Sequence, residues 1–175
     1  MTAIAANLVT AARSGDASAF AMLVHAETPA AYRLALSIVR SPAEAEDAVQ
    51  EAFLRAWRDI GSLREADLWP AWFRKLTVRS ALDQARRRHR VHEIDLDLAA
   101  GMPGREPSVS SADRLELMAA FDRLAPDDRA ILALRFFADL EVPDVAATLR
   151  IPLGTAKSRL HRAVERLRSH MRQEP

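Results

Sequence analysis

The spacing of apolar residues is the feature of this chain that most restricts its fold. Apolar side chains recur at intervals of three and four positions, which is the period of an α-helix. Strand-like alternation is nowhere sustained, and no Asn-Gly or Asp-Gly pair is present to close a hairpin. Glycine is also scarce, with five in 175 residues. We therefore predict an all-α protein.

Composition excludes several classes of protein. With 49% hydrophobic and 28% charged residues, the chain resembles a globular protein rather than a disordered one. No stretch approaches the ~18 apolar residues of a membrane span, and residues 2–12 lack the positive charge of a secretory signal. Cysteine is absent, which excludes disulfides, thiolate metal sites and cysteine nucleophiles. We expect a cytoplasmic protein without membrane insertion.

Residues 93–112 interrupt the helical pattern. They hold four acids, one arginine, two glycines, two prolines and three serines, a turn-forming and negatively charged composition. We interpret this segment as a flexible acidic linker between a first domain, residues 1–92, and a second, residues 113–175. Each domain is small for independent folding. Because the net charge is only +1, any nucleic-acid binding requires cations gathered locally.

A helix start is recognisable at Ser41. Serine suits the N-cap, Pro42 suits the first helical position, and Glu44 completes a capping box. The helix that follows has an apolar side and a charged side. The predicted apolar side consists of Ala48, Val49, Ala52, Phe53, Ala56 and Ile60, with Trp57 at its margin.

The opposite side of this helix is charged, with Leu54 in its middle. Its polar members are Asp47, Gln50, Glu51 and Arg58. A leucine in such a place suits a contact with a partner protein, but single exposed leucines are common and need no function. The periodicity leaves both interpretations open.

Aromatic and basic residues gather between residues 68 and 90. Trp69, Trp72 and Phe73 lie in a stretch with seven Arg or Lys residues and one acid, Asp83. Aromatic rings stack on unpaired bases and guanidinium groups neutralise phosphates, so the segment suits single-stranded nucleic acid. Aromatic residues at helical spacing also form cores, and terminal arginines also complement a helix dipole. These alternatives stay open at the level of sequence.

Residues 140–164 have the layout of a helix-turn-helix: a short helix to 149, a turn of about four residues, and a second helix from Gly154. Lys157, Arg159 and Arg162 come early in the second helix, where each opposes the helix dipole by roughly 0.3–1 kcal/mol. A nearby phosphate backbone would offset that cost. A helical hairpin with a solvated basic face is the alternative, and Arg159 suits either phosphate or its own domain.

Three groups of residues, in this order, resemble the bacterial extracytoplasmic-function (ECF) sigma factors of the sigma-70 family. Residues 45–57 resemble the segment that binds core RNA polymerase. Residues 72–76, with Leu82, Asp83 and 86–88, resemble the promoter-melting segment. Residues 154–163 resemble the C-terminal DNA-reading helix. The resemblance covers nearly the whole chain except the linker.

The resemblance implies a sigma factor, a non-catalytic subunit that binds core RNA polymerase and directs it to particular promoters. The implied partners are the clamp helices of the largest polymerase subunit, the polymerase flap and promoter DNA. An anti-sigma inhibitor is implied by the resemblance only. No catalytic residue, metal or cofactor is implied. The protein is expected to be cytoplasmic and to associate with the nucleoid when bound to polymerase.

The resemblance also assigns residues to each contact. For core polymerase these are Asp47, Gln50, Glu51, Leu54 and Arg58. For the minus-ten element, where a loop near residues 63–68 receives a flipped base, they are Leu63, Asp67, Leu68, Trp72, Lys75, Arg79, Arg86 and Arg87. For the minus-thirty-five element they are Thr155, Lys157, Ser158, Arg159, His161 and Arg162.

The chain departs from the family pattern at three places. Arg79 lies where members commonly carry asparagine, which shifts contact toward phosphate, and residues 65–67 lack the usual small loop residues. Arg150 stands where helix-turn-helix units favour glycine, and a left-handed backbone there would cost about 1 kcal/mol or more.

Two rival functions fit parts of the sequence. A DNA-binding regulator would use the helix-turn-helix alone and would not need the charged helix face or the aromatic-basic segment. An enzyme would use possible metal ligands between residues 89 and 95, namely His89, His92, Glu93 and Asp95. That cluster lies at the boundary between a helix and the linker and has no support elsewhere.

Overall fold

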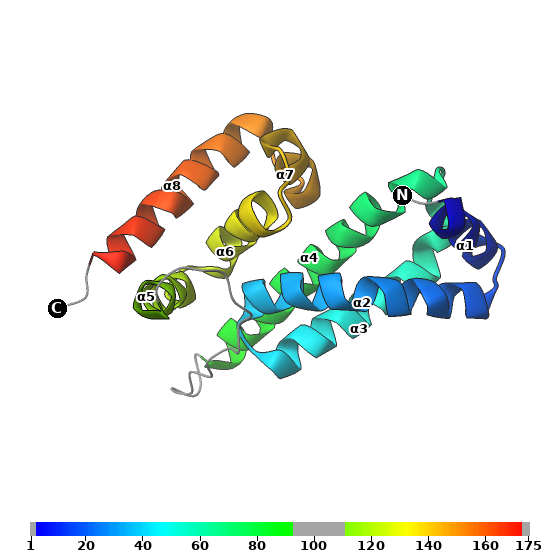
Figure 1. Cartoon of the computed structure of the whole chain (residues 1–175), viewed down its shortest axis with the longest axis horizontal. Helices are drawn as coiled ribbons and strands as arrows, with labels where there is room; N and C mark the ends of the chain where they lie inside the picture. The colour runs from blue at the N-terminus through cyan, green and yellow to red at the C-terminus, as the bar shows by residue number, and fades with distance from the viewer. Residues whose placement is uncertain (1–2, 93–110, 173–175) are drawn as a thin grey trace. The chain divides into compact units, whose positions relative to one another are not determined.

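The computed structural model describes residues 3–92 and 111–172, and these ranges contain helices and no strand (Figure 1). The predicted all-α fold is confirmed for them. Two compact units divide between Arg86 and Arg87. Most of the predicted linker, residues 93–110, lies outside the described residues, and a helix already begins at Ser111. The domain boundaries at 92 and 113 therefore stay predictions.

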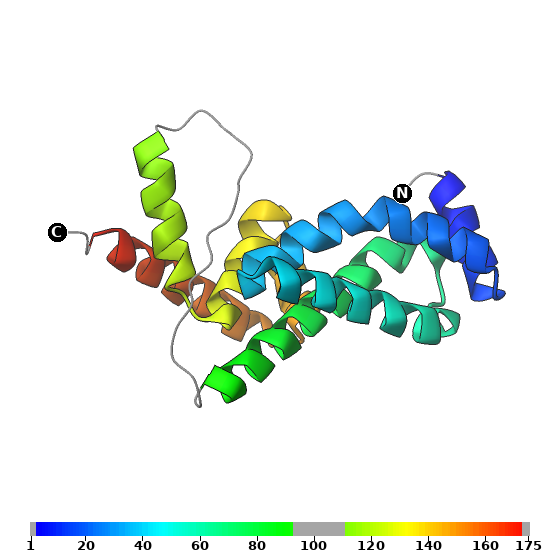
Figure 2. The ribbon, with the colours of Figure 1, turned by 90° about the horizontal axis from the view of Figure 1, so that it is seen from below.

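The first unit is built from four α-helices and two short 3-10 turns. They are α1 (Ala3–Arg13), α2 (Ala17–Val39), α3 (Pro42–Asp59), η1 (Ile60–Ser62), η2 (Ala66–Leu68) and α4 (Trp69–His92), of which α4 belongs to the first unit up to Arg86. Helices α2 and α3 run side by side in both views (Figures 1 and 2). Helix α1 packs against α2 and against η1 and η2. Contacts with α1 therefore help to position the loop before α4.

Helix starts in this unit follow local side-chain chemistry. Asp16 caps α2, its carboxylate accepting from the backbone N–H groups of Ser18 at 2.8 Å and Ala19 at 3.0 Å. Ser41 caps α3, its hydroxyl accepting from the N–H of Glu44 at 3.4 Å, with proline in the first turn. The predicted helix start at Ser41 is thus confirmed.

Stacked aromatic rings form the centre of the first unit. Trp69 is 1% exposed and lies parallel to Phe73, with ring centroids 5.2 Å apart. Phe73 in turn stacks on Phe53 of α3 at 4.5 Å, and Phe20 of α2 meets Trp69 edge-on. The predicted apolar side of α3 is buried as expected, and Trp57 lies at its exposed margin. Helices α2, α3 and α4 therefore share one aromatic core.

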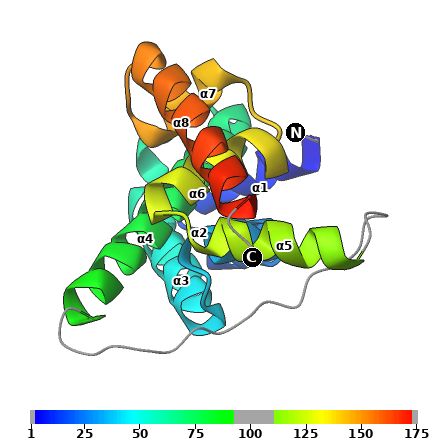
Figure 3. The ribbon, with the colours of Figure 1, turned by 90° about the vertical axis from the view of Figure 1, so that its left-hand side faces the viewer.

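The second unit contains the predicted helix-turn-helix. Its elements are α5 (Ser111–Asp122), α6 (Pro126–Leu132), the π-helical turn η3 (Ala133–Phe137), α7 (Val142–Leu149) and α8 (Leu153–Met171). Helix α8 packs against α5, α6 and α7 (Figure 3). Its buried stripe is centred on Ala156 and Ala163, whereas Leu160, Val164 and Leu167 are half-buried. The long helix thus buries small residues and leaves its other side to solvent.

The turn between α7 and α8 passes through a left-handed residue. Arg150 has φ 55° and ψ 45°, and its backbone N–H donates to the carbonyl of Ala146. The N–H of Ile151 donates to the same carbonyl at 3.0 Å. This is a helix C-cap that favours glycine, because a Cβ is strained at such a φ.

We expect Arg150→Gly to stabilise the second unit by roughly 0.5–1 kcal/mol, because glycine adopts this conformation without Cβ strain. Amide hydrogen exchange of α7 and α8 in the full chain measures this unit separately from the first. Arg172→Gly is the matched control, since Arg172 caps α8 at φ −83° and has no such strain to relieve. Equal effects of the two substitutions would contradict the strain argument.

Candidate functional site

The charged side of α3 is exposed at its centre. Leu54 is 59% exposed. Asp47, Gln50 and Arg58 are exposed around it, and Glu51 is half-buried. The expected apolar side chain on a charged surface is therefore present, and such a side chain suits contact with a protein partner.

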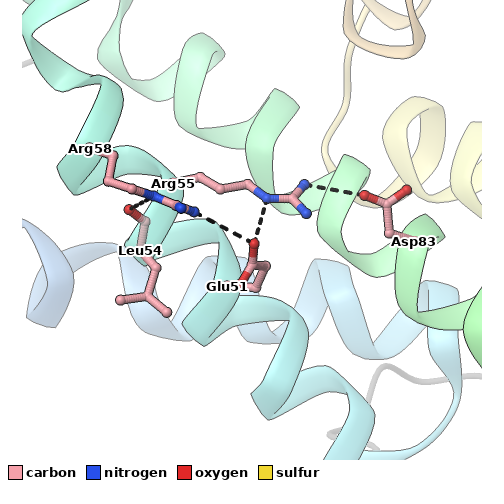
Figure 4. Close-up of polar contacts among 5 residues, drawn as sticks. All are labelled: Glu51, Leu54, Arg55, Arg58 and Asp83. Atoms are coloured by element: carbon pink, nitrogen blue, oxygen red, sulfur yellow. Dashed lines mark hydrogen bonds and ion pairs between the residues drawn. The ribbon is translucent and has the colours of Figure 1, made fainter.

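Beneath this surface, Arg55 joins α3 to α4 (Figure 4). Its Nε donates to Glu51 Oε1 at 2.8 Å, and its Nη1 donates to Asp83 Oδ2 at 3.2 Å. Arg58 Nη2 lies 3.8 Å from the same Glu51 oxygen, while its Nε donates to the Leu54 carbonyl at 3.3 Å. Glu51 is thus held from two sides, which orients the polar groups next to Leu54.

The carboxylates next to Arg55 favour its protonated, positively charged form. Partial burial acts to lower its pKa, but hydrogen bonds and ion pairs with Glu51 and Asp83 outweigh burial and raise the pKa above its ordinary value. The sequence prediction did not include Arg55. Its spacing of four from Glu51 signals an ion pair, whereas Asp83 lies 28 residues away and leaves no local pattern.

The loop between α3 and α4 buries one of the predicted minus-ten residues. Leu63 is 4% exposed, because its apolar side chain packs into the first unit, and its contact with DNA stays a prediction. Asp67 and Leu68 are exposed at the end of the loop, as expected of residues that meet a ligand. The second half of this loop therefore contains the predicted minus-ten residues that are accessible to a ligand.

Helix α4 divides its aromatic residues between core and surface. Trp69 and Phe73 are buried, whereas Trp72 is half-buried, with its ring centroid 5.7 Å from that of Trp69. The candidate cations of this helix lie further along: Lys75 is half-buried, and Arg79, Arg86 and Arg87 are exposed. One aromatic ring and a row of cations are thus accessible on α4.

The start of α8 presents the expected DNA-reading residues. Lys157, Ser158, His161 and Arg162 are exposed, and Thr155 is half-buried. The Ser158 hydroxyl donates to the Thr155 carbonyl at 3.1 Å, and Arg162 Nε donates to the Ser158 carbonyl at 3.2 Å. These short-range bonds orient both side chains along the helix surface.

Two arginines of α8 turn toward α6 instead. Arg159 Nη1 lies 3.7 Å from Asp127 Oδ1, so its guanidinium points to its own domain, one of the two orientations the sequence left open. Arg166 Nη1 forms an ion pair with Asp128, whose side chain is buried. Asp128 was not among the predicted residues, since its partner lies 38 residues away. These pairs fix the rotation of α8 about its axis.

The described residues contain no group of three or more His, Asp or Glu side chains placed to hold a metal ion. Of the four ligand candidates near the end of α4, Glu93 and Asp95 lie outside the described residues. Within the described ranges, no helix combines the length and apolar character needed to cross a bilayer.

Comparison with known proteins connects these surfaces to a family. Residues 23–91 match the Sigma-70 region 2 family model, and residues 114–167 match that of Sigma-70, region 4. RNA polymerase sigma factor SigV of Bacillus subtilis is 31% identical over 144 residues, covering 82% of this chain and 85% of SigV. This chain belongs to the ECF sigma factors of the sigma-70 family.

A further sequence relative and two solved structures are also similar to this sigma factor. ECF RNA polymerase sigma factor SigE of Mycolicibacterium smegmatis is 31% identical over 155 residues, which cover 85% of this chain but 60% of that longer protein. The fold is similar to that of RpoE in its complex with the anti-sigma factor NepR from Bartonella quintana, with a TM-score of 0.70, 24% identity and coverage of 89% and 98% of the two chains. It is also similar to CnrH in its complex with the cytosolic domain of CnrY, with a TM-score of 0.68, 22% identity and coverage of 98% and 99%.

Membership of this family decides between the rival functions. A sigma factor is a DNA-binding initiation factor and not an enzyme, and it directs promoter-specific transcription. The region 2 match spans the charged face of α3 and the aromatic-basic α4, which a regulator using a helix-turn-helix alone would not need. The same match begins at residue 23, so α1 and the first part of α2 lie outside it.

We expect Arg55→Met to lower the free energy of unfolding of the first unit of this sigma factor by about 1 kcal/mol. Each of its two ion pairs is partly exposed, and pairs of this kind contribute about 0.2–1 kcal/mol. All three tryptophans lie in the first unit, so urea unfolding followed by tryptophan fluorescence measures that unit.

A double-mutant cycle with Asp83→Asn isolates the bond between α3 and α4. We expect a coupling of a few tenths of a kcal/mol or more. Arg33→Met, at an exposed arginine of α2, controls for loss of a cation. Additive effects of Arg55→Met and Asp83→Asn would show that the bond contributes no stability.

Proposed function

We propose that the two units of this sigma factor divide the work of promoter recognition. The exposed face of α3 binds the clamp helices of the largest subunit of core RNA polymerase. The second half of the 60–68 loop and the exposed side of α4 read and open the minus-ten element. The start of α8 reads the minus-thirty-five element, and the second unit also contacts the polymerase flap.

The geometry around Leu54 carries the core-binding proposal. An apolar side chain with 59% of its surface exposed contributes little to the packing of its own unit. Charged residues surround it, and Arg55 and Arg58 hold Glu51 in one orientation. Apolar centres with polar rims are typical of protein interfaces, because the rim provides orientation while burial of the centre provides affinity.

The accessible side of α4 supports minus-ten reading. Half-buried Trp72 offers part of a ring to an unpaired base, and Arg79, Arg86 and Arg87 are exposed, with Arg86 Nη1 3.6 Å from Asp83 Oδ1. Stacking on an aromatic ring contributes about 1–3 kcal/mol per base, and arginines add phosphate contacts that do not depend on sequence. Melted DNA therefore finds both kinds of contact along one helix.

The electrostatics of α8 support duplex reading. Its first acid, Glu165, comes after Lys157 and Arg162 and is engaged by Arg168 at 2.7 Å. The first half of α8 thus carries cations and no acid, and a phosphate backbone is a partner that neutralises this positive charge. A helix N-terminus entering the major groove is the geometry of helix-turn-helix proteins.

The predicted acidic linker, residues 93–112, suits a protein that selects promoters only when bound to polymerase. A flexible linker of this length has a relaxed span of roughly 25 Å and a maximum of about 65 Å. Since the net charge of the whole chain is +1, the free protein binds promoters weakly, and polymerase raises the effective concentration of one unit relative to the other. Function then takes place at the nucleoid.

An anti-sigma factor is a further proposed partner. The solved relatives CnrH and RpoE are each described in complex with another protein, the cytosolic domain of CnrY and the anti-sigma factor NepR.

Promoter-specific run-off transcription by core polymerase plus this protein tests the main proposal. Tight duplex binding without a transcript would favour the regulator instead.

We expect Leu54→Asp to weaken binding to core polymerase by at least about tenfold while leaving the fold intact, because it places a charge at the apolar centre of the interface. Binding is measured by fluorescence anisotropy of labelled protein, and folding by circular dichroism. Met22→Asp is the matched control, since Met22 is 56% exposed on α2 and lies outside this face. Equal loss in both variants would contradict the assignment.

We expect the double substitution Lys157→Ala with Arg162→Ala to spare core binding but to abolish selection of the minus-thirty-five element. Both side chains are exposed, Lys157 in the second turn of α8 and Arg162 near its middle, within the part of a recognition helix that reaches base edges. Run-off transcription from a genomic fragment library measures selection. Arg168→Ala with Arg172→Ala removes the same charge from the far end of α8, and normal promoter choice by the first pair would exclude α8 as the reading helix.

A further inference from the structure

Two long-range hydrogen bonds fix the ends of the exposed part of the 60–68 loop. Arg13 Nη1 of α1 donates to the Arg64 carbonyl at 3.3 Å. Trp69 Nε1 donates to the Glu27 carboxylate of α2 at 3.1 Å, across 42 residues. The segment between these anchors contains Asp67 and Leu68, both exposed. The surface of this segment is thus positioned by helices that it does not belong to.

The Glu27 bond acts on the point where the loop becomes a helix. Trp69 is the first residue of α4, follows η2 directly, and its backbone N–H donates to the Ala66 carbonyl. Its ring is buried between Phe20 and Phe73. A bond that fixes the indole therefore also fixes where η2 ends and in which direction Leu68 projects.

The chemistry of this pair suits a positioning role. A buried indole N–H requires an acceptor, because leaving it unpaired carries a desolvation penalty. Glu27 is half-buried and is the only acid of α2, and a carboxylate is a stronger acceptor than a neutral group. Stacking alone restrains the plane of the Trp69 ring, whereas the Glu27 bond fixes the direction of its edge.

We propose that Glu27 is a positioning residue for base selection at the minus-ten element. By accepting from Trp69, it holds Asp67 and Leu68 in the conformation that receives an unpaired base. Exposed loops otherwise sample many conformations, and a preformed loop avoids that ordering cost on binding. This inference rests on the proposed function, in which the second half of the loop contacts melted DNA.

Two substitutions separate the hydrogen bond from the charge. Glu27→Gln removes the charge but keeps an oxygen that accepts from the indole, whereas Glu27→Leu removes both. Trp69→Phe is a second variant that removes the donor and keeps an aromatic ring. Combined with Glu27→Leu, it should cause little further loss, because both substitutions delete the same bond.

The probe is a pool of single-stranded DNA oligonucleotides with a randomised central window, selected by full-length protein bound to core polymerase. We expect Glu27→Leu to reduce enrichment of the preferred bases by about tenfold at the positions read by the loop. Glu27→Gln should select like wild type. Core binding and total binding of the unselected pool should be unchanged in both, since phosphate contacts do not depend on the loop.

A second measurement reports on the bond itself. We expect three tryptophan indole N–H resonances from the free protein, one for each of its three tryptophans, and Trp69→Phe identifies that of Trp69. We expect its hydrogen exchange to accelerate in Glu27→Leu and to stay slow in Glu27→Gln. A purely structural role for Glu27 would instead weaken core binding and DNA binding together and leave base preference unchanged.

The possible outcomes distinguish failure of the proposed minus-ten function from failure of the Glu27 inference alone. If wild-type holoenzyme enriches no bases from the pool, minus-ten reading by the first unit fails and the inference fails with it. If wild type enriches bases and Glu27→Leu enriches them equally, the inference alone is overturned. Loss of enrichment in both Glu27 variants would overturn the hydrogen-bond role, because glutamine keeps the acceptor.

Discussion

Burial of the Trp69 ring is the interaction on which the first unit depends. The ring lies parallel to Phe73, which stacks on Phe53, and Phe20 closes the cluster from α2. Aromatic rings bury about 150–250 Å² each, so a small domain gains much of its core from a few of them. Both proposed binding surfaces are oriented by this cluster: Phe53 sets the rotation of α3, and Trp69 sets the start of α4.

In the second unit, polar contacts rather than large apolar side chains fix the rotation of α8 about its axis. Its long helix α8 buries mainly alanines, and small side chains alone allow a helix to slide or rotate. The buried carboxylate of Asp128 pairs with Arg166, and Arg129 donates to the carbonyls of Leu124 and Asp122 at the turn before α6. Directional polar contacts thus supply the precision that large apolar side chains supply in the first unit.

Local patterns predicted most of the fold, and long-range partners explain what they missed. The period of apolar residues, the Ser41 cap and the helix-turn-helix were all available within a few residues, and the structure confirms them. The burial of Leu63 has no signal in the sequence, because one apolar residue in a loop has no period to reveal it. The bonds Arg55–Asp83, Trp69–Glu27 and Arg166–Asp128 have no local sequence signal, because their partners lie between 28 and 42 residues apart.

The ion pair between Arg159 and Asp127 has a consequence for how this sigma factor responds to salt. An arginine that binds a phosphate displaces condensed counterions from DNA. Each such contact makes the slope of log affinity against log salt concentration more negative by about 0.9. An arginine that keeps its carboxylate displaces none. In the proposed complex of α8 with promoter DNA, Arg159 therefore adds nothing to the dependence of affinity on ionic strength while Asp127 holds it.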